Sequence, residues 1–547
     1  MTSLKKEWIW LIALIVISFF ANSGVIEVNL MESRNLTTAR EMLQKGNWLE
    51  PTMNGELRFE KPPLPTWLAA TSMAVFGQDN RFFLRMPAGI AAALLIFFLF
   101  KLVKELTDDK KIPFWAAGTA ATSFYVFFMA RDICWDIFCH SFMLGAIWQL
   151  HRGLHNRLSN NLNFIYSAIL MVLSFLSKGP VSFFALLLPY LIASLIAYGP
   201  APFKQKLKPL SLMVIIVLAF SSIWPLYIYF IHPDYSVYVA QKESAAWISR
   251  NTKPFYHYWS FTAQSGIWII LATAALVFPY AAKRINRFGN YRFMATWVWA
   301  SVILLSLFPE KKERYLLPVL LPLAILTAYY LHYLIASFAN NNHTRSDTII
   351  LRINSWISGL AALILPIAVF WMIRKNGFSP GVIITAVSFI GFWGIAYYLL
   401  KSGVKKNPES LWRGMTALVA LTCLLVFYQI PQIVQKNPNF RPYYELRQKP
   451  ELEQVPFFGN FSWDGKHLEM VWASGREIKQ WDPIANPALP VNAPLVLISK
   501  APADSILSPE ILHNYTIENI GLFDANLQKR WGGSVLRNHV TLIKPKN

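Results

Sequence analysis

The sequence is poor in charged residues. Asp, Glu, Lys and Arg make up 15% of its 547 residues, whereas soluble globular proteins carry about 25%. Hydrophobic residues make up 54%, and the mean hydropathy is +0.35. The apolar runs at 8–20, 90–100 and 210–220 each lie in a window of roughly 20 apolar residues, which is the length that crosses the hydrocarbon core of a bilayer. The composition excludes an ordinary soluble enzyme and predicts an integral membrane protein.

Cysteine is scarce, and long basic stripes are absent. The three cysteines, Cys134, Cys139 and Cys423, match no CxxC metal pattern and form no disulfide framework, so we interpret them as buried apolar residues. The net charge is +21, but the basic residues lie in short loops between apolar runs, where they set membrane topology. Nucleic acid is therefore not expected as a partner, because motifs that read bases or dock in a groove are missing.

Loop charge predicts the side of the membrane on which each loop lies. With Lys5 and Lys6 in the cytoplasm, alternate loops such as the lysine-rich 204–208 segment fall on the same side, as the positive-inside rule requires. The first run has no small-residue cleavage site after it, so we expect a retained helix. The predicted spans lie near 8–26, 86–104, 113–130, 134–150, 163–177, 180–198, 209–229, 264–282, 293–308, 316–338, 354–373, 379–400 and 411–430.

The composition becomes that of a soluble protein after residue 430. Apolar runs at 494–498 and 540–543 are typical of buried strands, and 503–514 has helical character. We therefore predict two domains. Residues 1–430 would form a transmembrane domain of about thirteen helices, including far-side loops 27–80 and 231–262 with helices on the membrane surface. Residues 431–547 would form a small periplasmic α/β domain.

Charged side chains recur at span ends on the far side of the membrane. Charges beside hydrocarbon are costly unless they line a cavity filled with water or substrate. Lys and Arg bind phosphate oxygens and stabilise a phosphate leaving group, and a carboxylate can deprotonate an attacking hydroxyl. The residues in question are Glu32, Arg34, Glu60, Lys61, Arg131, Asp132, Asp136, Lys178, Lys242, Glu243, Arg250, Lys253, Glu310, Lys311, Lys312, Glu313 and Arg314.

Several short motifs follow one another in an order known from one family. They are Glu32-x-Arg34, Ala39-Arg40-Glu41-Met42, Gly46-x-Trp48-x-x-Pro51, Phe59-Glu60-Lys61-Pro62-Pro63-Leu64, Ser177-Lys178-Gly179-Pro180 and Lys311-Lys312-x-Arg314-Tyr315-x-x-Pro318. The ordered set resembles that of the type-C glycosyltransferases. These protein-mannosyltransferase-like enzymes use polyprenyl-phosphate sugars, and the nearest resemblance is to their lipid A aminoarabinose transferase branch.

The resemblance implies an enzyme of the bacterial inner membrane that moves a sugar from an undecaprenyl-phosphate carrier to an acceptor at the periplasmic face. The acceptor would be lipid A, another envelope glycan or a protein. Glu32 or Asp136 would act as the base. The residues that would bind the donor phosphate or substrate are Arg34, Glu60, Lys61, Arg131, Asp132, Lys178, Glu243, Arg250, Lys311, Lys312, Arg314 and Tyr315.

Two positions depart from the family pattern. Where the family has Asp before Glu, this chain has Met31, and Asn35 replaces the usual Tyr. That Asp is a leading candidate for the family's catalytic acid, so either Glu32 or Asp136 takes the role or the acceptor differs. A divalent ion held by Glu60 and Glu243 is compatible with the sequence, although nothing in the sequence requires a metal cofactor.

A transporter or flippase of lipid-linked sugars is the main alternative. Such proteins often place charges near the bilayer midplane and contain inverted repeats. Here the charges lie at span ends on one side, and no repeat is apparent. A non-catalytic scaffold for envelope assembly would leave the ordered motifs unexplained. The sequence therefore favours the enzyme.

Overall fold

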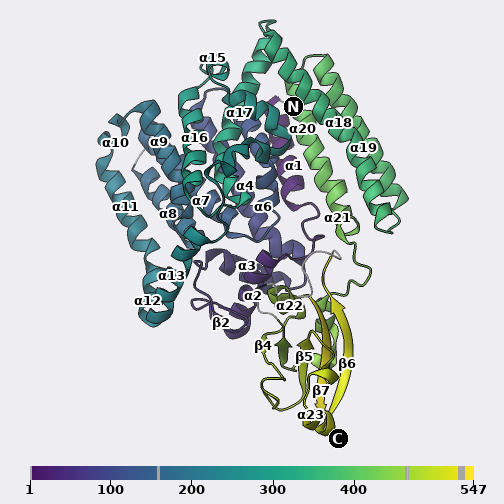
Figure 1. Ribbon diagram of the computed structural model, residues 1–547. Coiled ribbons are helices and arrows are strands. Elements are labelled where there is room, and N and C mark those ends of the chain that lie inside the picture. The colour runs from purple at the N-terminus through teal and green to yellow at the C-terminus, as the bar shows by residue number, and fades with distance from the viewer. Residues whose placement is uncertain (1–2, 157–160, 462–464, 466, 528–535, 547) are drawn as a thin grey trace.

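The computed structural model describes residues 3–156, 161–461, 465, 467–527 and 536–546. It consists of a helical body, a group of short helices at one end of it, and a β-sheet unit formed by the C-terminal residues (Figure 1). The N-terminus lies at one end of the helical body, and the C-terminus lies at the tip of the sheet unit, beyond the opposite end (Figure 1).

Long apolar helices dominate the body. Its helices are α1 (Ser3–Phe20), α4 (Arg81–Leu106), α5 (Ile112–Ala121), α6 (Phe124–Met129), α7 (Trp135–His155), α8 (Leu162–Lys178), α9 (Leu188–Tyr198), α10 (Ala201–Gln205), α11 (Leu207–Ser221), α12 (Ile223–Ile231), α14 (Ile269–Leu276), α15 (Tyr280–Ile285), α16 (Tyr291–Leu307), α17 (Leu317–Ala339), α18 (Arg345–Lys375), α19 (Val382–Val404), α20 (Pro408–Leu421) and α21 (Phe427–Val434). Single-turn π segments precede α9 (Phe183–Leu187) and α21 (Thr422–Val426), and 3-10 segments precede α14 (Phe255–Trp268) and α17 (Glu313–Leu316).

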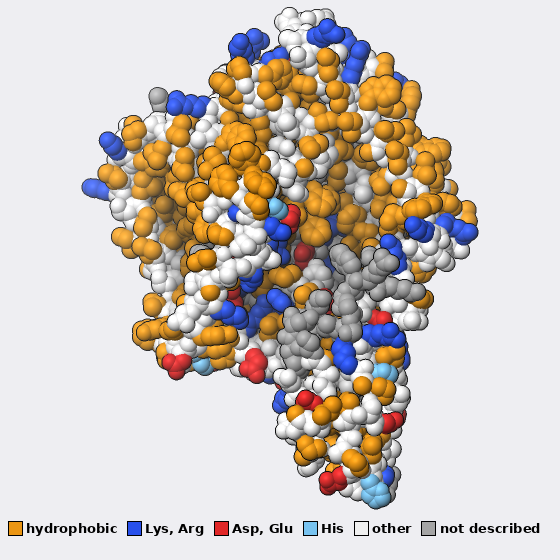
Figure 2. Space-filling model, viewed as in Figure 1, with side chains coloured by type: hydrophobic (Ala, Val, Ile, Leu, Met, Phe, Trp, Pro, Cys, Tyr) orange, Lys and Arg blue, Asp and Glu red, His pale blue; other side chains and the backbone are white. Residues whose placement is uncertain are grey.

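Seven helices in the described part of the chain are long and apolar enough to cross a membrane. They are Arg81–Leu106, Leu207–Ile231, Phe255–Leu276, Glu313–Ala339, Arg345–Lys375, Val382–Val404 and Pro408–Val434. Large apolar side chains are exposed along α11, α12, α18 and α19, and hydrophobic atoms cover most of the visible face of the body (Figure 2). An apolar surface of this extent is stable only against lipid or another apolar partner.

The predicted spans coincide with helices, but several of these are interrupted. The span predicted at 113–130 is divided into α5 and α6 around Ser123, whose hydroxyl bonds back to the Thr119 carbonyl. The span predicted at 209–229 is divided into α11 and α12 at Ser222, three residues before Pro225. Proline lacks the N–H that an uninterrupted helix needs, and serine hydroxyls compete for helix carbonyls. These breaks shorten the continuous helices, and the number of spans stays a prediction.

Helix α17 occupies the centre of the body. Nearly all of its side chains are buried, from Leu317 to Ser337, and it contacts α5, α14 and α16. A helix that is apolar on every side is a core helix. Its N-terminal end carries the short segment Glu313–Leu316, so this rigid helix fixes the position of Arg314 and Tyr315.

Three helices lie outside the body, within the two predicted far-side loops. They are α2 (Leu30–Lys45), α3 (Leu64–Phe76) and α13 (Pro233–Ser249). A capping box fixes the start of α2: the Asn29 side chain accepts hydrogen bonds from the N–H groups of Met31 and Glu32, and Glu32 accepts one from the Asn29 N–H. The helix ends at Gly46, whose φ of 72° suits glycine. Between α2 and α3 lies the small hairpin of β1 (Thr52–Met53) and β2 (Glu56–Leu57).

The C-terminal unit contains a five-stranded mixed sheet in the order β4-β3-β5-β7-β6. Its elements are β3 (Phe457–Asn460), α22 (His467–Ser474), β4 (Ile478–Gln480), β5 (Leu495–Ser499), α23 (Pro509–Asn514), β6 (Tyr515–Asp524) and β7 (Arg537–Pro545), with 3-10 turns at Tyr443–Gln448, Pro450–Leu452 and Ala503–Ser505. The strands predicted at 494–498 and 540–543 are confirmed as parts of β5 and β7. The helix predicted over 503–514 is shorter, because Ser508 and Pro509 begin a new helix there.

The sheet unit is attached to the α2–α3 region through backbone groups. The Arg40 guanidinium on α2 donates to the Val471 carbonyl of α22 at 3.0 Å. The Asn54 side chain pairs with both backbone groups of Ile478, each at 2.8 Å. Ile478 lies on β4, the edge strand of the sheet, so Asn54 satisfies an edge that would otherwise be open.

Asn54→Ala should loosen this attachment. The substitution removes two hydrogen bonds, which corresponds to roughly 1–2 kcal/mol of docking free energy. Limited proteolysis of the purified full chain should then release the C-terminal unit faster than in the unmodified protein. Asn47→Ala, at an exposed position of the same loop, is the matched control. Equal rates of release for Asn54→Ala and the unmodified chain would contradict the prediction.

Candidate active site

A cavity of about 520 Å³ lies where the surface helices meet the helical body. Charged side chains make up much of its wall, and the rest includes apolar residues of the body such as Val181, Phe184, Leu305 and Phe308. The cavity therefore borders both a polar and an apolar environment, as a site for an amphiphilic ligand must. Its charged residues are Arg34, Arg58, Glu60, Lys61, Asp136, Lys178, Lys242, Glu243, Arg250, Glu310, Lys312 and Arg314.

Asp136 is the most buried carboxylate in this wall, with 2% of its side chain exposed. It lies in the first turn of α7 and accepts a hydrogen bond from Lys178, the last residue of α8. Its second oxygen lies 3.9 Å from Nε of Arg314. The Lys178 ammonium lies 5.0 Å from the centre of the Tyr315 ring. The structure thus brings together four residues that the sequence predicted for the site.

Glu60 and Lys61 each form an ion pair with a residue of α13. Nζ of Lys61 lies 2.7 Å from Glu243, and Nζ of Lys242 lies 3.0 Å from Glu60. Two adjacent residues of the loop thus pair with two adjacent residues of the helix. Burial alone would raise the pKa of the Glu60 carboxyl, but the hydrogen bond from Lys242, a backbone hydrogen bond and the charges of Lys242 and Arg58 together outweigh burial and lower the pKa. The pairs fix α13 over the cavity.

Glu310 joins the end of α13 to the segment before α17. It accepts from Nε of Arg250 at 2.9 Å and from Nζ of Lys312 at 2.8 Å. Burial would raise the pKa of this carboxyl, but the hydrogen bonds from Lys312 and Arg250 lower it. Arg250 and Lys312, both predicted to bind substrate, therefore share one acidic partner, Glu310, which the sequence placed among the far-side charges but not among the substrate ligands.

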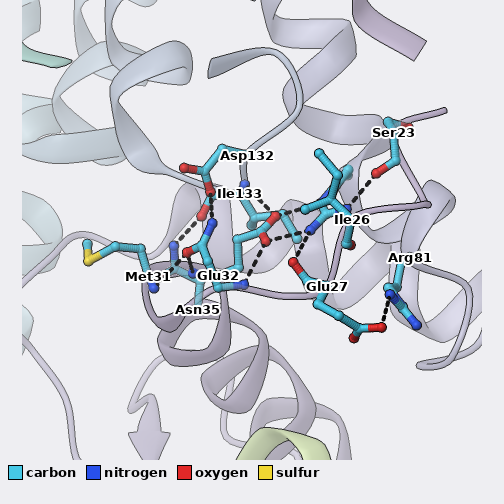
Figure 3. Close-up of polar contacts among 11 residues, drawn as sticks. Ser23, Ile26, Glu27, Met31, Glu32, Asn35, Arg81, Asp132 and Ile133 are labelled. Carbon is cyan, nitrogen blue, oxygen red and sulfur yellow. Dashed lines mark hydrogen bonds and ion pairs between the residues drawn. The ribbon is translucent and has the colours of Figure 1, made fainter. Parts of the chain in front are cut away.

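Glu32 does not line the cavity. Its fully buried carboxylate accepts hydrogen bonds from Arg85 at 2.7 and 2.6 Å and from the Ile133 N–H at 3.3 Å (Figure 3). The side chain of Met31 extends away from this group, and Met31 is a cavity residue (Figure 3). The structure therefore places the two consecutive residues on different sides of α2, and Glu32 in a structural position.

Arg131, Asp132 and Lys311 also lie off the cavity. Arg131 donates to the carbonyls of Ile17, Ser18 and Ala21 at 3.1, 2.8 and 2.6 Å, and so caps the C-terminal end of α1. Asp132 accepts from Asn29 at 3.4 Å, and burial, together with the charge of Glu32, raises the pKa of its carboxyl to about 7. Lys311 donates to the carbonyls of Phe308 and Lys253. Each of these three side chains, predicted to bind the donor phosphate or substrate, instead forms hydrogen bonds with backbone carbonyls or with a neighbouring side chain.

Arg58 is a cavity residue that the sequence prediction missed. Its guanidinium donates to the Arg34 carbonyl at 2.6 Å, to the Thr38 hydroxyl at 2.7 Å and to the Asn35 side chain at 3.3 Å. It also lies 5.1 Å from the Trp135 ring centre. Arg58 directly precedes the Phe59-Glu60-Lys61 motif, and this adjacency was the signal available in the sequence. Lys242 was placed among the far-side charges from the sequence but was not named as a substrate ligand.

A metal has little support in this geometry. Among the described residues, no group of three or more His, Cys, Asp or Glu side chains is positioned to hold a metal ion. Glu60 and Glu243, the two candidate ligands from the sequence, each form an ion pair with a lysine. An ammonium at hydrogen-bond distance occupies the place that a cation would take, so these residues do not fit a divalent ion.

Comparison with known proteins points to one class. Residues 60–224 match the family model described as dolichyl-phosphate-mannose-protein mannosyltransferase. The chain is 25% identical over 504 residues to the undecaprenyl phosphate-alpha-4-amino-4-deoxy-L-arabinose arabinosyl transferase of Pectobacterium atrosepticum, covering 86% of this chain and 87% of that protein. The protein of the same name from Serratia proteamaculans is 26% identical over 453 residues, with 79% and 78% covered.

Solved structures have the same fold. ArnT from Cupriavidus metallidurans bound to undecaprenyl phosphate superposes with a TM-score of 0.67 at 15% identity, over 98% of this chain and 97% of that one. The archaeal oligosaccharyltransferase AglB from Archaeoglobus fulgidus gives 0.50 at 12% identity, over 87% of this chain and 65% of that one. The chain is thus an integral membrane protein with the fold of membrane glycosyltransferases. The matches confirm the resemblance to polyprenyl-phosphate-dependent type-C enzymes, including the aminoarabinose transferase branch.

Lys178→Met tests the buried ion group. The substitution leaves the buried Asp136 carboxylate with only the more distant Arg314, and breaking a buried pair typically costs about 3–5 kcal/mol. The melting temperature of the detergent-purified protein should fall clearly. Adding Asp136→Asn to this variant should restore part of the loss, because the buried carboxylate charge that lost its ammonium partner is then removed as well. An unchanged melting temperature for Lys178→Met alone would show that the ion pair does not stabilise the folded protein.

Proposed function

We propose that the protein is a glycosyltransferase that moves a sugar from a polyprenyl-phosphate carrier, of the undecaprenyl type, to an acceptor at the far face of the membrane. The observation that carries the proposal is the cavity itself: one deeply buried carboxylate among cations, beside an apolar wall. The apolar residues suit a lipid chain, the cations suit its phosphate, and the carboxylate suits an acceptor proton.

In the proposed reaction the acceptor oxygen attacks the sugar carbon bonded to phosphate. Asp136 takes the acceptor's proton, the new glycosidic bond forms, and the carbon–oxygen bond to the phosphate breaks. The lipid phosphate leaves as an anion and needs no proton, because nearby cations stabilise its charge. The residues proposed to do so are Lys61, Lys178, Arg250, Lys312 and Arg314, with Tyr315 as a further hydrogen-bond donor.

Asp136 is preferred over Glu32 as the base. Glu32 is bound by Arg85 and the Ile133 N–H, away from the cavity. Asp136 is bound by Lys178, which also faces the cavity. A donor phosphate that arrives between Lys178 and Arg314 would compete with Asp136 for these cations. Donor binding would thereby release the carboxylate for proton transfer.

We further propose that the chain crosses the bacterial inner membrane thirteen times, with residues 1–430 as the transmembrane domain and 431–547 as a periplasmic domain. Lys and Arg side chains gather at the end of the body that holds the N-terminus, opposite the sheet unit, as expected if that end is cytoplasmic (Figure 2). The acceptor would then be periplasmic: lipid A, another envelope glycan or a protein. Membrane lipids would be further partners of the protein.

Asp136→Asn should abolish transfer. The loss of a general base lowers the rate by roughly 10²–10⁴-fold. The assay uses the protein in vesicles containing labelled polyprenyl-phosphate sugar and a bacterial envelope extract, and measures label bonded to any acceptor. Glu32→Gln is the matched carboxylate control, and its rate per folded molecule should stay within about tenfold of the unmodified rate, since its role is structural. Full transfer by Asp136→Asn would overturn the assignment.

The same vesicle assay distinguishes a glycosyltransferase from a transporter. A flippase would move the donor across the bilayer and leave its sugar–phosphate bond intact. Movement of unbroken donor with no bonded label, in the unmodified protein, would favour that alternative and remove the proposed chemistry.

Lys61→Met should weaken donor binding. A charge-assisted hydrogen bond to phosphate is worth about 1.5–3 kcal/mol, so the KM for the donor should rise by roughly 10- to 100-fold. Lys479→Met, at an exposed position of β4, is the matched control and should leave KM unchanged. A KM unaltered by Lys61→Met would exclude Lys61 from the phosphate site.

A further inference from the structure

One residue of the C-terminal unit lies against a side chain of the cavity. Gly465 has a φ of +91°, and a Cβ atom at this position would lie 2.8 Å from Nη2 of Arg34. Ordinary van der Waals contacts of a Cβ atom begin near 3.4 Å, so the guanidinium fills the space that a side chain would need. Both the backbone conformation and the close approach require glycine. Since Arg34 lines the cavity, the C-terminal unit reaches a cavity side chain through Gly465.

Few polar contacts fix the direction of the Arg34 guanidinium. In the described part of the chain it forms no ion pair or hydrogen bond, and its Nε is buried without a partner. The charge of Glu60 attracts the guanidinium, while the charge of Arg250 repels it. Charges that act from a distance and in opposite senses do not set the direction of a long, flexible side chain. The packing of its end against Gly465 supplies the missing constraint.

The position of Gly465 relative to α2 is itself fixed. Helix α22 begins two residues later, at His467, and lies beside α2 (Figure 1). The Arg40 guanidinium of α2 donates to the Val471 carbonyl of α22 at 3.0 Å. Trp472 is buried in one apolar cluster with side chains of α2 and α3. The start of α22, and Gly465 with it, is therefore held at a set place beside the helix that carries Arg34.

We infer that the C-terminal unit is part of the active site, in which Gly465 is a positioning residue that directs the Arg34 guanidinium into the cavity. The inference rests on the proposed function. Arg34 donates its free N–H groups to oxygen atoms of the bound substrates, and Gly465 acts only through Arg34. A methyl group at position 465 would push the guanidinium by at least about 0.6 Å, the difference between 3.4 and 2.8 Å. The end of an arginine side chain can move this far without disturbing the attachment of α22 to α2.

Gly465→Ala in the full chain tests this role. Misplacing a substrate-binding group by a fraction of an ångström lowers catalytic efficiency by roughly tenfold, so kcat/KM for the labelled polyprenyl-phosphate sugar in the vesicle assay should fall by about this factor. Gly377→Ala is the matched control, because Gly377 has a φ of +85° and a Cβ atom there meets no described atom within 4 Å. Both variants carry the same backbone strain and should lose similar melting temperature. The kcat/KM of the control should stay within about twofold of the unmodified value.

Arg34→Lys shows whether the effect of Gly465→Ala passes through Arg34. Lysine keeps the charge, and with it measurable transfer, but it is shorter and has no atom at the position of Nη2. A methyl group at position 465 then has nothing to displace. Arg34→Lys should lower kcat/KM by itself, and adding Gly465→Ala should lower it further by less than about twofold. The two changes are thus expected to be non-additive.

The outcomes separate this inference from the proposed function. Equal kcat/KM for Gly465→Ala and Gly377→Ala, with transfer by the unmodified protein, overturns the inference and leaves the glycosyltransferase intact. A roughly tenfold loss from Gly465→Ala that persists in the Arg34→Lys background also overturns it, because the glycine then acts by another route. Absence of transfer by the unmodified protein refutes the proposed function, and the inference fails with it.

Discussion

The ion pair between Asp136 and Lys178 joins the first turn of α7 to the last residue of α8, and the site is arranged around it. A carboxylate and an ammonium buried beside hydrocarbon are stable only with each other and with further polar partners. Arg314 supplies the second cation from the segment before α17. Three helices are therefore tied at one level by charge, and the same charges supply the chemistry proposed for the cavity.

The surrounding arginines fall into two kinds with different partners. Arg85 and Arg131 donate to carbonyls at the end of α1 and in the segment that follows it, residues 17–27. They fix the path of the chain from the body to α2. Arg34 and Arg58 instead line the cavity, although Arg58 also donates to the Arg34 carbonyl. The three-dimensional surroundings of each guanidinium therefore decide whether it lies at the cavity or only binds the backbone.

Sequence reasoning located the helices and part of the site for clear physical reasons. Apolar length marks a span, and a charge at a span end is costly without a partner, so Asp136 and Lys178 stood out. The pairing of Glu32 with Arg85 could not be predicted, because these residues lie 53 positions apart and Arg85 falls inside an apolar helix. The binding of Arg131 to the carbonyls of α1 leaves no trace in the sequence either, since backbone acceptors look alike at every position.

The directions in which the residues of α2 point explain how Met31, in place of the family's Asp, changes the site. An α-helix turns by about 100° per residue, so neighbouring residues face different directions, whereas residues three apart share a side. Met31 and Arg34 both line the cavity, while Glu32 and Asn35 both bond to Ile133 on the other side. Glu32 therefore cannot replace an acid at position 31 without rotating the helix and breaking its contact with Arg85. With no acid at position 31, Asp136 is the most buried acid that lines the cavity.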